Sequence, residues 1–372
     1  MRNLIFLIAI ALMLAFAVFC LFYRKWSRKS VKRLCMFGGL VAALALGYFW
    51  CCPAWRYPDV TGPYGVARLD AAYIDDSRAE PYESDGSARW LNVSFWYPEG
   101  YADGGNTCPL IVFSHGSFGT RESNAVQYRE LASHGYVVCA IEHTYQSLGT
   151  TGPDGEKAGL DSGYQKQVLH ANDDTPEQRA ELAGLFRGWM AVRTADINFV
   201  LDTIISQTDA GKDGVYRLVD TSRIGLMGHS MGGAAALAAG RERSDVSAVI
   251  ALEAPFMGDV KGVDSEGNLM WDDTPYPVPL LSVYSDSARP ILDTSPQYAQ
   301  NSAVLHDGRA DTQDIYAEGA GHMTLTDLAY ELPPLCLLFG QDLFFDADKY
   351  EADINAAYVE FLDEYLKGGN QE

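Results

Sequence analysis

The sequence predicts an α/β fold, in which a mainly parallel sheet carries helices on both faces, preceded by two transmembrane helices. Two observations predict it. Short apolar runs alternate with helical patterns through residues 57–372, whereas two long uncharged runs fill most of residues 1–56. Because parallel strands are joined by right-handed helical crossovers, the alternation favours a single sheet. We therefore expect a membrane anchor over 1–56 and one folded domain over 57–372.

The first 56 residues contain two candidate membrane spans. Residues 3–23 hold no charge over 21 positions, and as a helix this run is about 31 Å long, close to the thickness of a bilayer core. Residues 34–52 repeat the pattern, and Tyr48, Phe49 and Trp50 stand where an interfacial aromatic belt is expected. Two such helices joined by a short loop predict a hairpin.

The orientation follows from the loop 24–33, which carries six basic residues. The positive-inside rule places this loop in the cytoplasm, so the chain is expected to be a multi-pass membrane protein with an extracytoplasmic domain. The alternative is a cleavable signal peptide over 1–23, because Arg2 precedes the run and small residues lie near its end. That run is long for a signal peptide, and cleavage would leave the basic loop outside. The two-span interpretation is therefore favoured.

Charge and cysteine spacing exclude whole classes of function. Residues 1–56 contain eight basic residues and no acid, which leaves 20 basic and 49 acidic residues in 57–372, a net charge of −29. Such a surface repels phosphate backbones and argues against nucleic-acid binding. The cysteines form no Cys-x-x-Cys pair and no His/Cys ligand spacing, so no metal site is expected.

The first elements of the domain predict the edge and centre of the sheet. Residues 65–74 and 88–97 are strand-like, and the second run alternates apolar and polar residues, so an antiparallel pair is expected. Residues 109–113 form a continuous apolar run, typical of a strand buried on both faces. A helical pattern covers 121–133, and an apolar strand follows at 136–141.

The remaining elements continue the alternation. Residues 147–175 are rich in Gly, Asp and Thr and are expected to form a loop, either a lid or an insertion. Residues 176–207 have apolar positions at helical spacing. The order that follows is strand 223–227, helix 231–240, strand 247–252, loop 255–277, strand 279–284, segment 288–310, strand 313–317 and helix 350–366.

The most informative motif is Gly228-His229-Ser230-Met231-Gly232, which lies between an apolar strand and a small-residue helix. This is the setting of a nucleophile elbow in the α/β-hydrolase fold. The serine occupies a strained turn, and Gly228 and Gly232 let neighbouring backbones approach without Cβ clashes. The turn lifts the hydroxyl to a helix N-terminus, where backbone N–H groups stabilise an oxyanion. A glycine-rich helix cap without catalytic function is the alternative.

A nucleophilic serine needs a base and an acid, which in this fold follow in the order Ser, acid, His. The chain has two histidines beyond Ser230. His322 follows the last predicted strand in a glycine-flanked loop, whereas His306 lies in a polar segment and is expected to face solvent. The acid stays open between Glu253, after the strand that follows the nucleophile, and Asp286, after the next strand.

An earlier segment, 113–119 (FSHGSFG), follows a buried strand and fits the loop that lends a second oxyanion N–H. Ser117 and Met231 are the expected backbone donors. His115 is expected to be a structural hydrogen-bonding residue at the strand end, and His143 a similar one.

These motifs resemble the platelet-activating-factor acetylhydrolase-like branch of the α/β-hydrolases. The resemblance covers about residues 65–366 and does not include the anchor. The strand end Trp96-Tyr97-Pro98 fits it as well. The four pieces that carry it are Phe113-Ser114-His115-Gly116, Gly228-His229-Ser230-Met231-Gly232-Gly233, Ala251-Leu252-Glu253 with Pro255 after it, and Gly321-His322-Met323-Thr324-Leu325-Thr326-Asp327.

The resemblance favours Glu253 as the acid, because the family carries it after the strand that follows the nucleophile. Glu253 lies 23 residues beyond Ser230, although the family usually has Asp there. The broader superfamily, polyester-hydrolase relatives included, places its acid where Asp286 stands.

The resemblance implies hydrolysis of a short or oxidised acyl ester, lipid esters included, without a metal or an organic cofactor. We expect Ser230 to attack the carbonyl, His322 to take and return the proton, and water to clear an acyl-enzyme. One alternative is an acyltransferase that uses the same triad. Another is a catalytically silent, membrane-anchored domain that binds a lipid, peptide or wall component.

Overall fold

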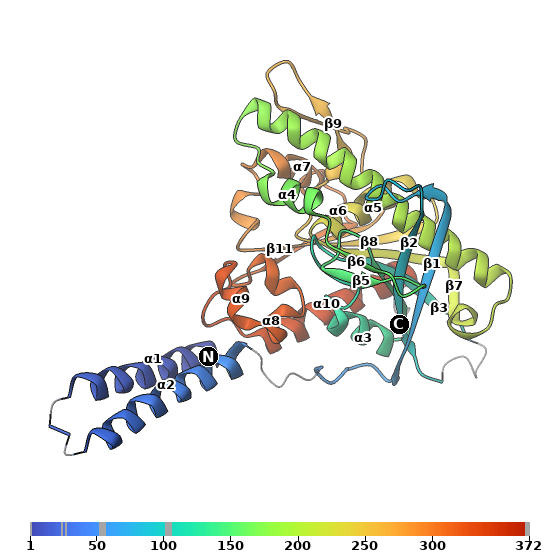
Figure 1. Ribbon diagram of the computed structural model, residues 1–372. Coiled ribbons are helices and arrows are strands. Elements are labelled where there is room, and N and C mark those ends of the chain that lie inside the picture. Colours follow the sequence, from blue (N-terminus) through green and yellow to red (C-terminus); the bar gives the residue numbers. More distant parts are fainter. Residues whose placement is uncertain (1, 24, 27, 52–56, 101–105, 369–372) are drawn as a thin grey trace. The chain divides into compact units, whose positions relative to one another are not determined.

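A single sheet organises the larger part of the chain (Figure 1). Its strands are β1 (Val66–Ala79), β2 (Ala88–Pro98), β3 (Cys108–Ser114), β4 (Val137–Glu142), β7 (Val219–His229), β8 (Val246–Leu252), β11 (Leu280–Ser285) and β12 (Thr312–Ala317). They lie in the order β1-β2-β4-β3-β7-β8-β11-β12. β1 and β2 pair antiparallel, as do β2 and β4, whereas β4, β3, β7, β8 and β11 are joined by parallel pairs. The predicted α/β-hydrolase fold is confirmed.

The computed structural model describes residues 2–23, 25–26, 28–51, 57–100 and 106–368. They fall into two units. Unit 1 consists of the chain up to Pro58, Ser285–Ser287 and Ala317–Glu351, and unit 2 of Asp59–Tyr284, Ala288–Tyr316 and the chain from Ala352. Most of the sheet belongs to unit 2.

The register of the central strands determines where functional side chains meet. Ser114 pairs with Gly228 across β3 and β7, and Gly228 pairs with Ala251 across β7 and β8. The carboxyl ends of these three strands therefore lie at one edge of the sheet. All seven residues of β3 are buried, as expected for a strand covered on both faces.

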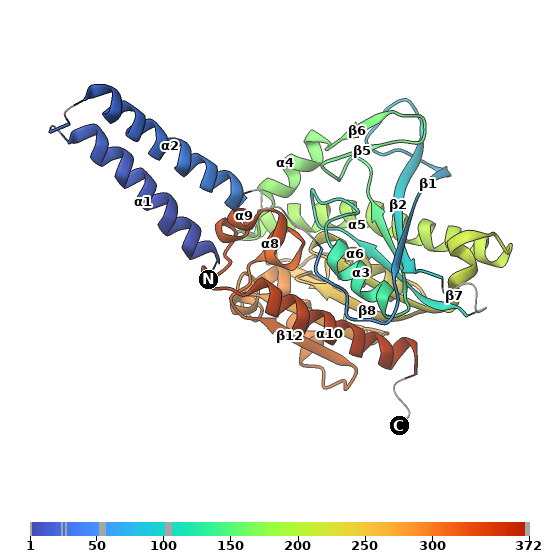
Figure 2. The same ribbon diagram turned by 90° about the horizontal axis from the view of Figure 1, so that it is seen from below.

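Helices cover both faces of the sheet. They are α3 (Ala125–Ser133), α5 (Pro176–Asp209), α6 (Met231–Glu242) and α10 (Ala347–Leu366). Figures 1 and 2 show α5 and α6 on one face, with α3 and the unit 2 part of α10 on the other. The first turn of α5 is fixed by its sequence. Pro176 occupies its first position, and Thr175 and Gln178 form a capping box that satisfies two free N–H groups.

The segment 147–175, expected as a loop, is largely ordered secondary structure. It contains a hairpin of β5 (Gly149–Thr151) and β6 (Lys157–Gly159), then α4 (Ser162–His170). The Asp161 carboxylate caps α4 by accepting the Tyr164 N–H at 2.7 Å. Strands of three residues and a nine-residue helix are too short to produce a periodic sequence pattern, which explains the error.

Other short elements were missed for the same reason. The expected loop 255–277 contains β9 (Val260–Val263) and β10 (Leu269–Trp271), and segment 288–310 contains α7 (Ala299–Leu305). In unit 1, α8 (Leu328–Glu331) and α9 (Pro333–Leu338) follow the loop that carries His322. The short 3-10 turns are Gly214–Leu218, Met257–Asp259, Arg289–Ile291, Pro296–Tyr298 and His322–Leu325.

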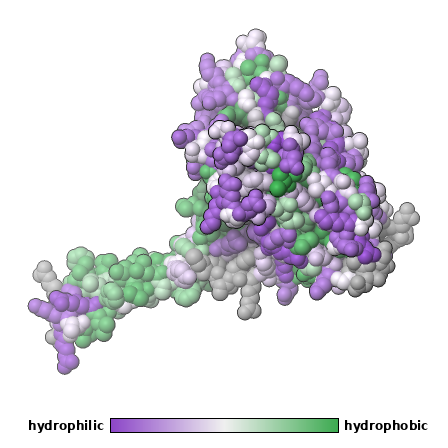
Figure 3. All heavy atoms as spheres, turned by 45° about the vertical axis from the view of Figure 1, so that its right-hand side comes forward, coloured by the Kyte–Doolittle hydropathy of each residue, from purple (hydrophilic) through white to green (hydrophobic). Residues whose placement is uncertain are grey.

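The N-terminal part of unit 1 is a hairpin of α1 (Arg2–Phe22) and α2 (Lys29–Cys51), drawn in blue in Figure 1. Both helices are long and apolar enough to cross a membrane. Figure 3 shows the hairpin largely hydrophobic along its length and hydrophilic at its turn. Part of the predicted loop 24–33 belongs to α2, and residues 1, 24, 27 and 52–56 of the predicted anchor lie outside the described residues.

Candidate active site

Ser230 lies between the end of β7 and the start of α6, in unit 2. Its backbone has φ 54° and ψ −124°, a region that residues other than glycine rarely occupy. Two hydrogen bonds hold this turn. The Ser230 N–H donates to the Leu252 carbonyl at 2.7 Å, and the Ser230 carbonyl accepts the Ala234 N–H at 2.9 Å. The strained serine is thereby tied to β8 on one side and to the first turn of α6 on the other.

Three glycines allow the strand, the helix and the 113–119 loop to meet at this turn. A Cβ at Gly232 would lie 2.0 Å from the Ser114 carbonyl oxygen, and one at Gly228 would lie 2.5 Å from the Gly232 carbonyl oxygen. A Cβ at Gly116 would lie 3.3 Å from the Ser230 Cβ. Any larger residue at positions 228 or 232 would push backbone against backbone.

A pocket of about 320 Å³ opens in front of Ser230. Ser117 and Met231 line it together with the serine. Among the described residues, neither of their N–H groups donates to a protein acceptor, so both stay available for an oxyanion. The other walls come from α4, α5 and neighbouring loops and combine apolar and polar side chains: Val168, Ala171, Asn172, Asp173, Leu182, Phe186, Trp189, Met257 and Gln297.

The two candidate acids lie in different units. Glu253 follows β8 in unit 2, is 3% exposed and has a φ of 45°. Its N–H donates to the Val283 carbonyl at 2.7 Å. Asp286 follows β11 in unit 1, where its N–H donates to the Ala320 carbonyl at 2.9 Å and its carboxylate accepts the Gly319 N–H at 3.2 Å.

His322 begins a 3-10 turn in unit 1, and its N–H donates to the Ser287 hydroxyl at 3.1 Å. The structure thus brings Asp286 and the loop of His322 together. The flanking glycines have local reasons: Gly319 has a φ of 79°, and a Cβ at Gly321 would lie 2.2 Å from the Phe339 carbonyl oxygen. Because Ser230 belongs to unit 2, its approach to His322 stays a prediction.

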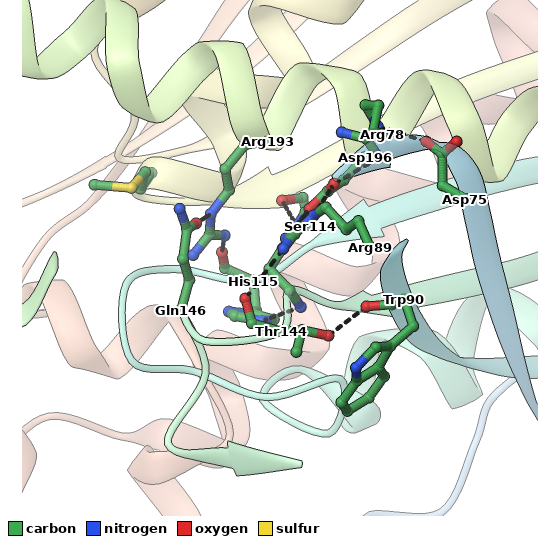
Figure 4. Close-up of polar contacts among 12 residues, drawn as sticks. Asp75, Arg78, Arg89, Trp90, Ser114, His115, Thr144, Gln146, Arg193 and Asp196 are labelled. Atoms are coloured by element: carbon green, nitrogen blue, oxygen red, sulfur yellow. Dashed lines mark hydrogen bonds and ion pairs between the residues drawn. The ribbon is translucent and has the colours of Figure 1, made fainter. Parts of the chain in front are cut away.

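Below the 113–119 loop lies a buried polar network that the sequence did not reveal (Figure 4). The His143 imidazole joins the Ser114 hydroxyl and the Asp196 carboxylate, each at 2.8 Å. All three side chains are fully buried. Burial and the charge of Arg193 lower the pKa of His143 to about 3, so the ring is neutral. Its proton therefore lies toward Asp196, and Ser114 donates to the other nitrogen.

Ion pairs hold the far side of this network. Arg89 makes two bonds of 2.6 Å to Asp196 and pairs with Glu80 at 2.9 Å. Burial alone would raise the pKa of Asp196, but Arg89 and His143 hold it well below its usual range. The one sequence signal for this network is that the charged residues Arg193 and Asp196 stand among the apolar positions of the helical pattern 176–207.

His115 also belongs to the network, beneath the proposed oxyanion donors. One ring nitrogen donates to the Gly116 carbonyl at 2.6 Å and the other accepts the His143 N–H at 3.2 Å. Burial, together with the charge of Arg193, holds the pKa of His115 well below its usual range, so this ring is neutral as well.

Comparison with known proteins places this chain in a family. The model of the family described as platelet-activating factor acetylhydrolase, isoform II, matches residues 99–371. Platelet-activating factor acetylhydrolase of Cavia porcellus is 25% identical over 282 residues, which cover 70% of this chain and 58% of the relative. Cutinase est1 of Thermobifida alba is 27% identical over 243 residues, 65% of this chain and 62% of the relative. The chain therefore spans less than two thirds of the length of either relative.

A solved structure shows the same fold. Ferulic acid esterase from Streptomyces cinnamoneus superposes with a TM-score of 0.57 and 22% sequence identity, covering 86% of this chain and 93% of that one. The sequence-based resemblance is confirmed by the family match, which includes Ser230, both candidate acids and His322. The chain belongs to the platelet-activating factor acetylhydrolase, isoform II, family of α/β-hydrolases.

Proposed function

We propose that this protein is a serine hydrolase that cleaves a carboxylic ester through an acyl-enzyme. One observation carries the proposal: Ser230 sits on a strained turn and lines one pocket with two residues whose N–H groups are unused. The relatives named as acetylhydrolase, cutinase and ferulic acid esterase support ester cleavage.

In the proposed mechanism, the Ser230 hydroxyl attacks the ester carbonyl while His322 takes its proton. The N–H groups of Ser117 and Met231 bind the developing oxyanion. His322 then returns the proton to the leaving alcohol, and water clears the acyl group in a second, equivalent step. This mechanism requires the His322 ring to come within about 3 Å of the Ser230 hydroxyl.

Two carboxylates compete for the role of the acid that orients His322. The family position supports Glu253, whereas the bond from Gly319, three residues before His322, supports Asp286. Glu253→Gln and Asp286→Asn keep the shape of each side chain and remove its charge. The variant with the larger loss of kcat identifies the acid.

The substrate we propose is an ester of a short acyl chain, lipid esters included. The pocket, at about 320 Å³, lies at the lower end of the range of about 300–1,000 Å³ for ligand sites. Its lining includes the large apolar side chains Leu182, Phe186 and Trp189, which offer an acyl chain apolar surface to bury.

We further propose that α1 and α2 cross the membrane, with the basic turn in the cytoplasm and residues from 57 onward outside. Their length and hydropathy support two spans, and the six basic residues of 24–33 support the orientation. The catalytic domain would then act beside a bilayer.

The full chain in detergent tests the esterase proposal with a fluorophosphonate probe and a p-nitrophenyl acetate assay. We expect wild type to be labelled and active, Ser230→Ala to lose both, and the controls Ser206→Ala, an exposed serine of α5, and Ser114→Ala to keep labelling. Equal labelling and turnover in Ser230→Ala would refute the nucleophile. Ester products formed with added alcohols would identify an acyltransferase, and a wild type inert to every probe a binding domain.

A further inference from the structure

Arg193, on α5, is a buried guanidinium that no carboxylate neutralises directly. Its side chain is fully buried, and among the described residues no carboxylate oxygen lies within 4.0 Å of it. Its three partners are neutral. Arg193 donates to the Gln146 amide oxygen at 2.5 Å and to the His115 carbonyl (Figure 4). It also donates to the Tyr164 hydroxyl at 3.4 Å. Burying a charge without a counter-ion is costly, so this arrangement needs an explanation.

No neighbouring acid forms a direct ion pair with Arg193 among the described residues. His115 and His143 are both held neutral. Asp196, one turn further along α5, is engaged by Arg89 through two bonds of 2.6 Å. Glu80 also pairs with Arg89, at 2.9 Å. The Arg193 guanidinium therefore contacts only neutral groups, one of which is the His115 carbonyl of the 113–119 loop, whereas the nearby acids pair with Arg89.

Each partner of Arg193 is connected to the residues proposed to bind the oxyanion. The His115 carbonyl lies two residues before Ser117 in the chain. The Tyr164 hydroxyl contacts the Ser117 hydroxyl at 3.2 Å and the Met231 sulfur at 3.1 Å.

The third partner, Gln146, fixes the end of the same loop. Its backbone carbonyl accepts the Phe118 N–H at 3.3 Å, next to Ser117. Phe118 has a φ of 64°, an unfavourable conformation that needs such external support. One side chain of α5 thus ties down both ends of the oxyanion loop and the α4 residue that touches Met231.

We propose that Arg193 is a positioning residue for the oxyanion hole, and that its buried positive charge stabilises the anionic tetrahedral intermediate formed at Ser230. This inference rests on the proposed esterase function. A preorganised charge in a poorly solvated site acts more strongly on an anion than the same charge in water. It favours the transition state over the neutral ester, so kcat depends on Arg193 and KM does not.

A purely structural role makes a different prediction. The ion cluster behind the loop holds three acids (Asp75, Glu80 and Asp196) and two arginines (Arg78 and Arg89), one negative charge in excess. If Arg193 only balanced this excess, its removal would lower stability and leave the affinity for an anionic adduct unchanged.

The test compares Arg193→Met, which removes the charge, with Arg193→Lys, which keeps it, in the full chain in detergent. Arg187→Met, an exposed arginine of the same helix, is the matched control. The readouts are kcat and KM for p-nitrophenyl acetate, and the inhibition constant of a trifluoromethyl ketone, which forms an anionic adduct with a serine. Circular dichroism and the melting temperature report folding.

For Arg193→Met we expect kcat to fall about tenfold or more, less than the roughly 10²–10³ lost with a direct oxyanion donor. The inhibition constant should rise by a similar factor while KM stays within about twofold, as expected when only transition-state interactions are lost. Arg193→Lys should recover part of the loss, and Arg187→Met should match wild type.

An Arg193→Met protein with wild-type kcat and inhibition constant would overturn the inference, as would a raised KM with unchanged kcat. If Arg193→Met does not fold, Arg193→Lys and Tyr164→Phe decide. In that case the inference requires that Arg193→Lys and Tyr164→Phe each have a lower kcat and a weaker affinity for the ketone than wild type. Wild-type values of kcat and ketone affinity in these two variants would overturn it. A wild type that neither turns over the ester nor reacts with the probe refutes the esterase proposal itself, before any Arg193 variant is compared.

Discussion

At the scale of single residues, a hydrogen-bonded set of a Ser, a His and an acid lies in the core and does not include the proposed nucleophile Ser230. Ser114, His143 and Asp196 are linked by two bonds of 2.8 Å, but all are fully buried. A histidine with a pKa of about 3 is a weak base. The Asp196 carboxylate is also engaged by Arg89, through an ion pair with two bonds of 2.6 Å. Ser230 differs because it lines a pocket on a strained turn.

The buried His143 predicts a pH dependence of stability. Its pKa is about 3 in the folded protein and about 6.5 when unfolded, so below pH 6.5 the unfolded chain binds more protons. The free energy of unfolding should therefore fall by up to about 1.4 kcal/mol per pH unit from this group as pH drops from about 6.5 to 3. Urea unfolding of wild type and His143→Gln across this window measures the difference, with exposed His306→Gln as control. Parallel curves for wild type and His143→Gln would contradict it.

Gly232 gives a second prediction at this scale. In Gly232→Ala the new methyl meets the Ser114 carbonyl at 2.0 Å, which displaces the oxyanion loop from the elbow. We expect a lower melting temperature and a loss in kcat/KM of about 10²-fold or more, the effect of losing an oxyanion donor. Gly188→Ala, on an open stretch of α5, should keep full activity and gain up to about 1 kcal/mol in stability. Full activity in Gly232→Ala would show that the loop can move away without cost.

At the scale of elements, α5 serves both the core and the site. One face packs on the sheet through Ile197, Val200 and Leu201, all 0–1% exposed. Earlier positions, among them Leu182 and Trp189, line the pocket beside Ser230. Because the same rigid helix also carries Arg193, a change in its packing is expected to alter pocket shape and oxyanion geometry together.

Leu182→Ala should widen the pocket and change acyl preference. The ratio of kcat/KM for octanoyl over acetyl p-nitrophenyl esters is expected to rise severalfold, at a cost in stability of about 2–5 kcal/mol. Leu201→Ala creates a cavity in the same helix away from the pocket, so it should lower stability without changing the ratio. A ratio that changes equally in both variants would mean that the pocket does not hold the acyl chain.

At the scale of the whole molecule, charge is divided between the anchor and the domain. Residues 1–56 contain eight basic residues and no acidic residue, whereas residues 57–372 carry a net charge of −29. Inside the hairpin, the Trp50 indole donates to the Asn3 amide oxygen at 3.2 Å, and Gly39 lets α2 approach Phe16 of α1 closely. Such small-residue and hydrogen-bonded contacts are typical of paired helices in a bilayer.

The proposed topology predicts the behaviour of fusion proteins. Alkaline phosphatase fused after residue 57 should be active, and the same enzyme fused within 24–33 should be inactive, because only the first lies outside the cytoplasm. An N-terminal tag should remain on the mature protein. Loss of the tag would identify residues 1–23 as a signal peptide, and phosphatase activity confined to the 24–33 fusion would reverse the orientation.

The fold class, the order of the main strands and helices, and the elbow at Ser230 could all be predicted from the sequence. These rest on local patterns: apolar runs, helical spacing, and glycines at fixed positions around a serine. The family match confirms that these local signals were sufficient for the fold. The triad itself, with Glu253 or Asp286 as its acid, stays a prediction because its members come from separate units.

The network beneath the oxyanion loop could not be predicted from the sequence and is seen only in the folded chain. Arg89, His143 and the α5 pair Arg193 and Asp196 come from three separate stretches of chain, and the sequence does not indicate that these stretches meet in one buried network. The same holds for α4, whose Tyr164 reaches Met231 from a segment that looked like a loop. Periodicity and motifs report which way a residue faces within its own element, whereas contacts between elements depend on packing that no local pattern encodes.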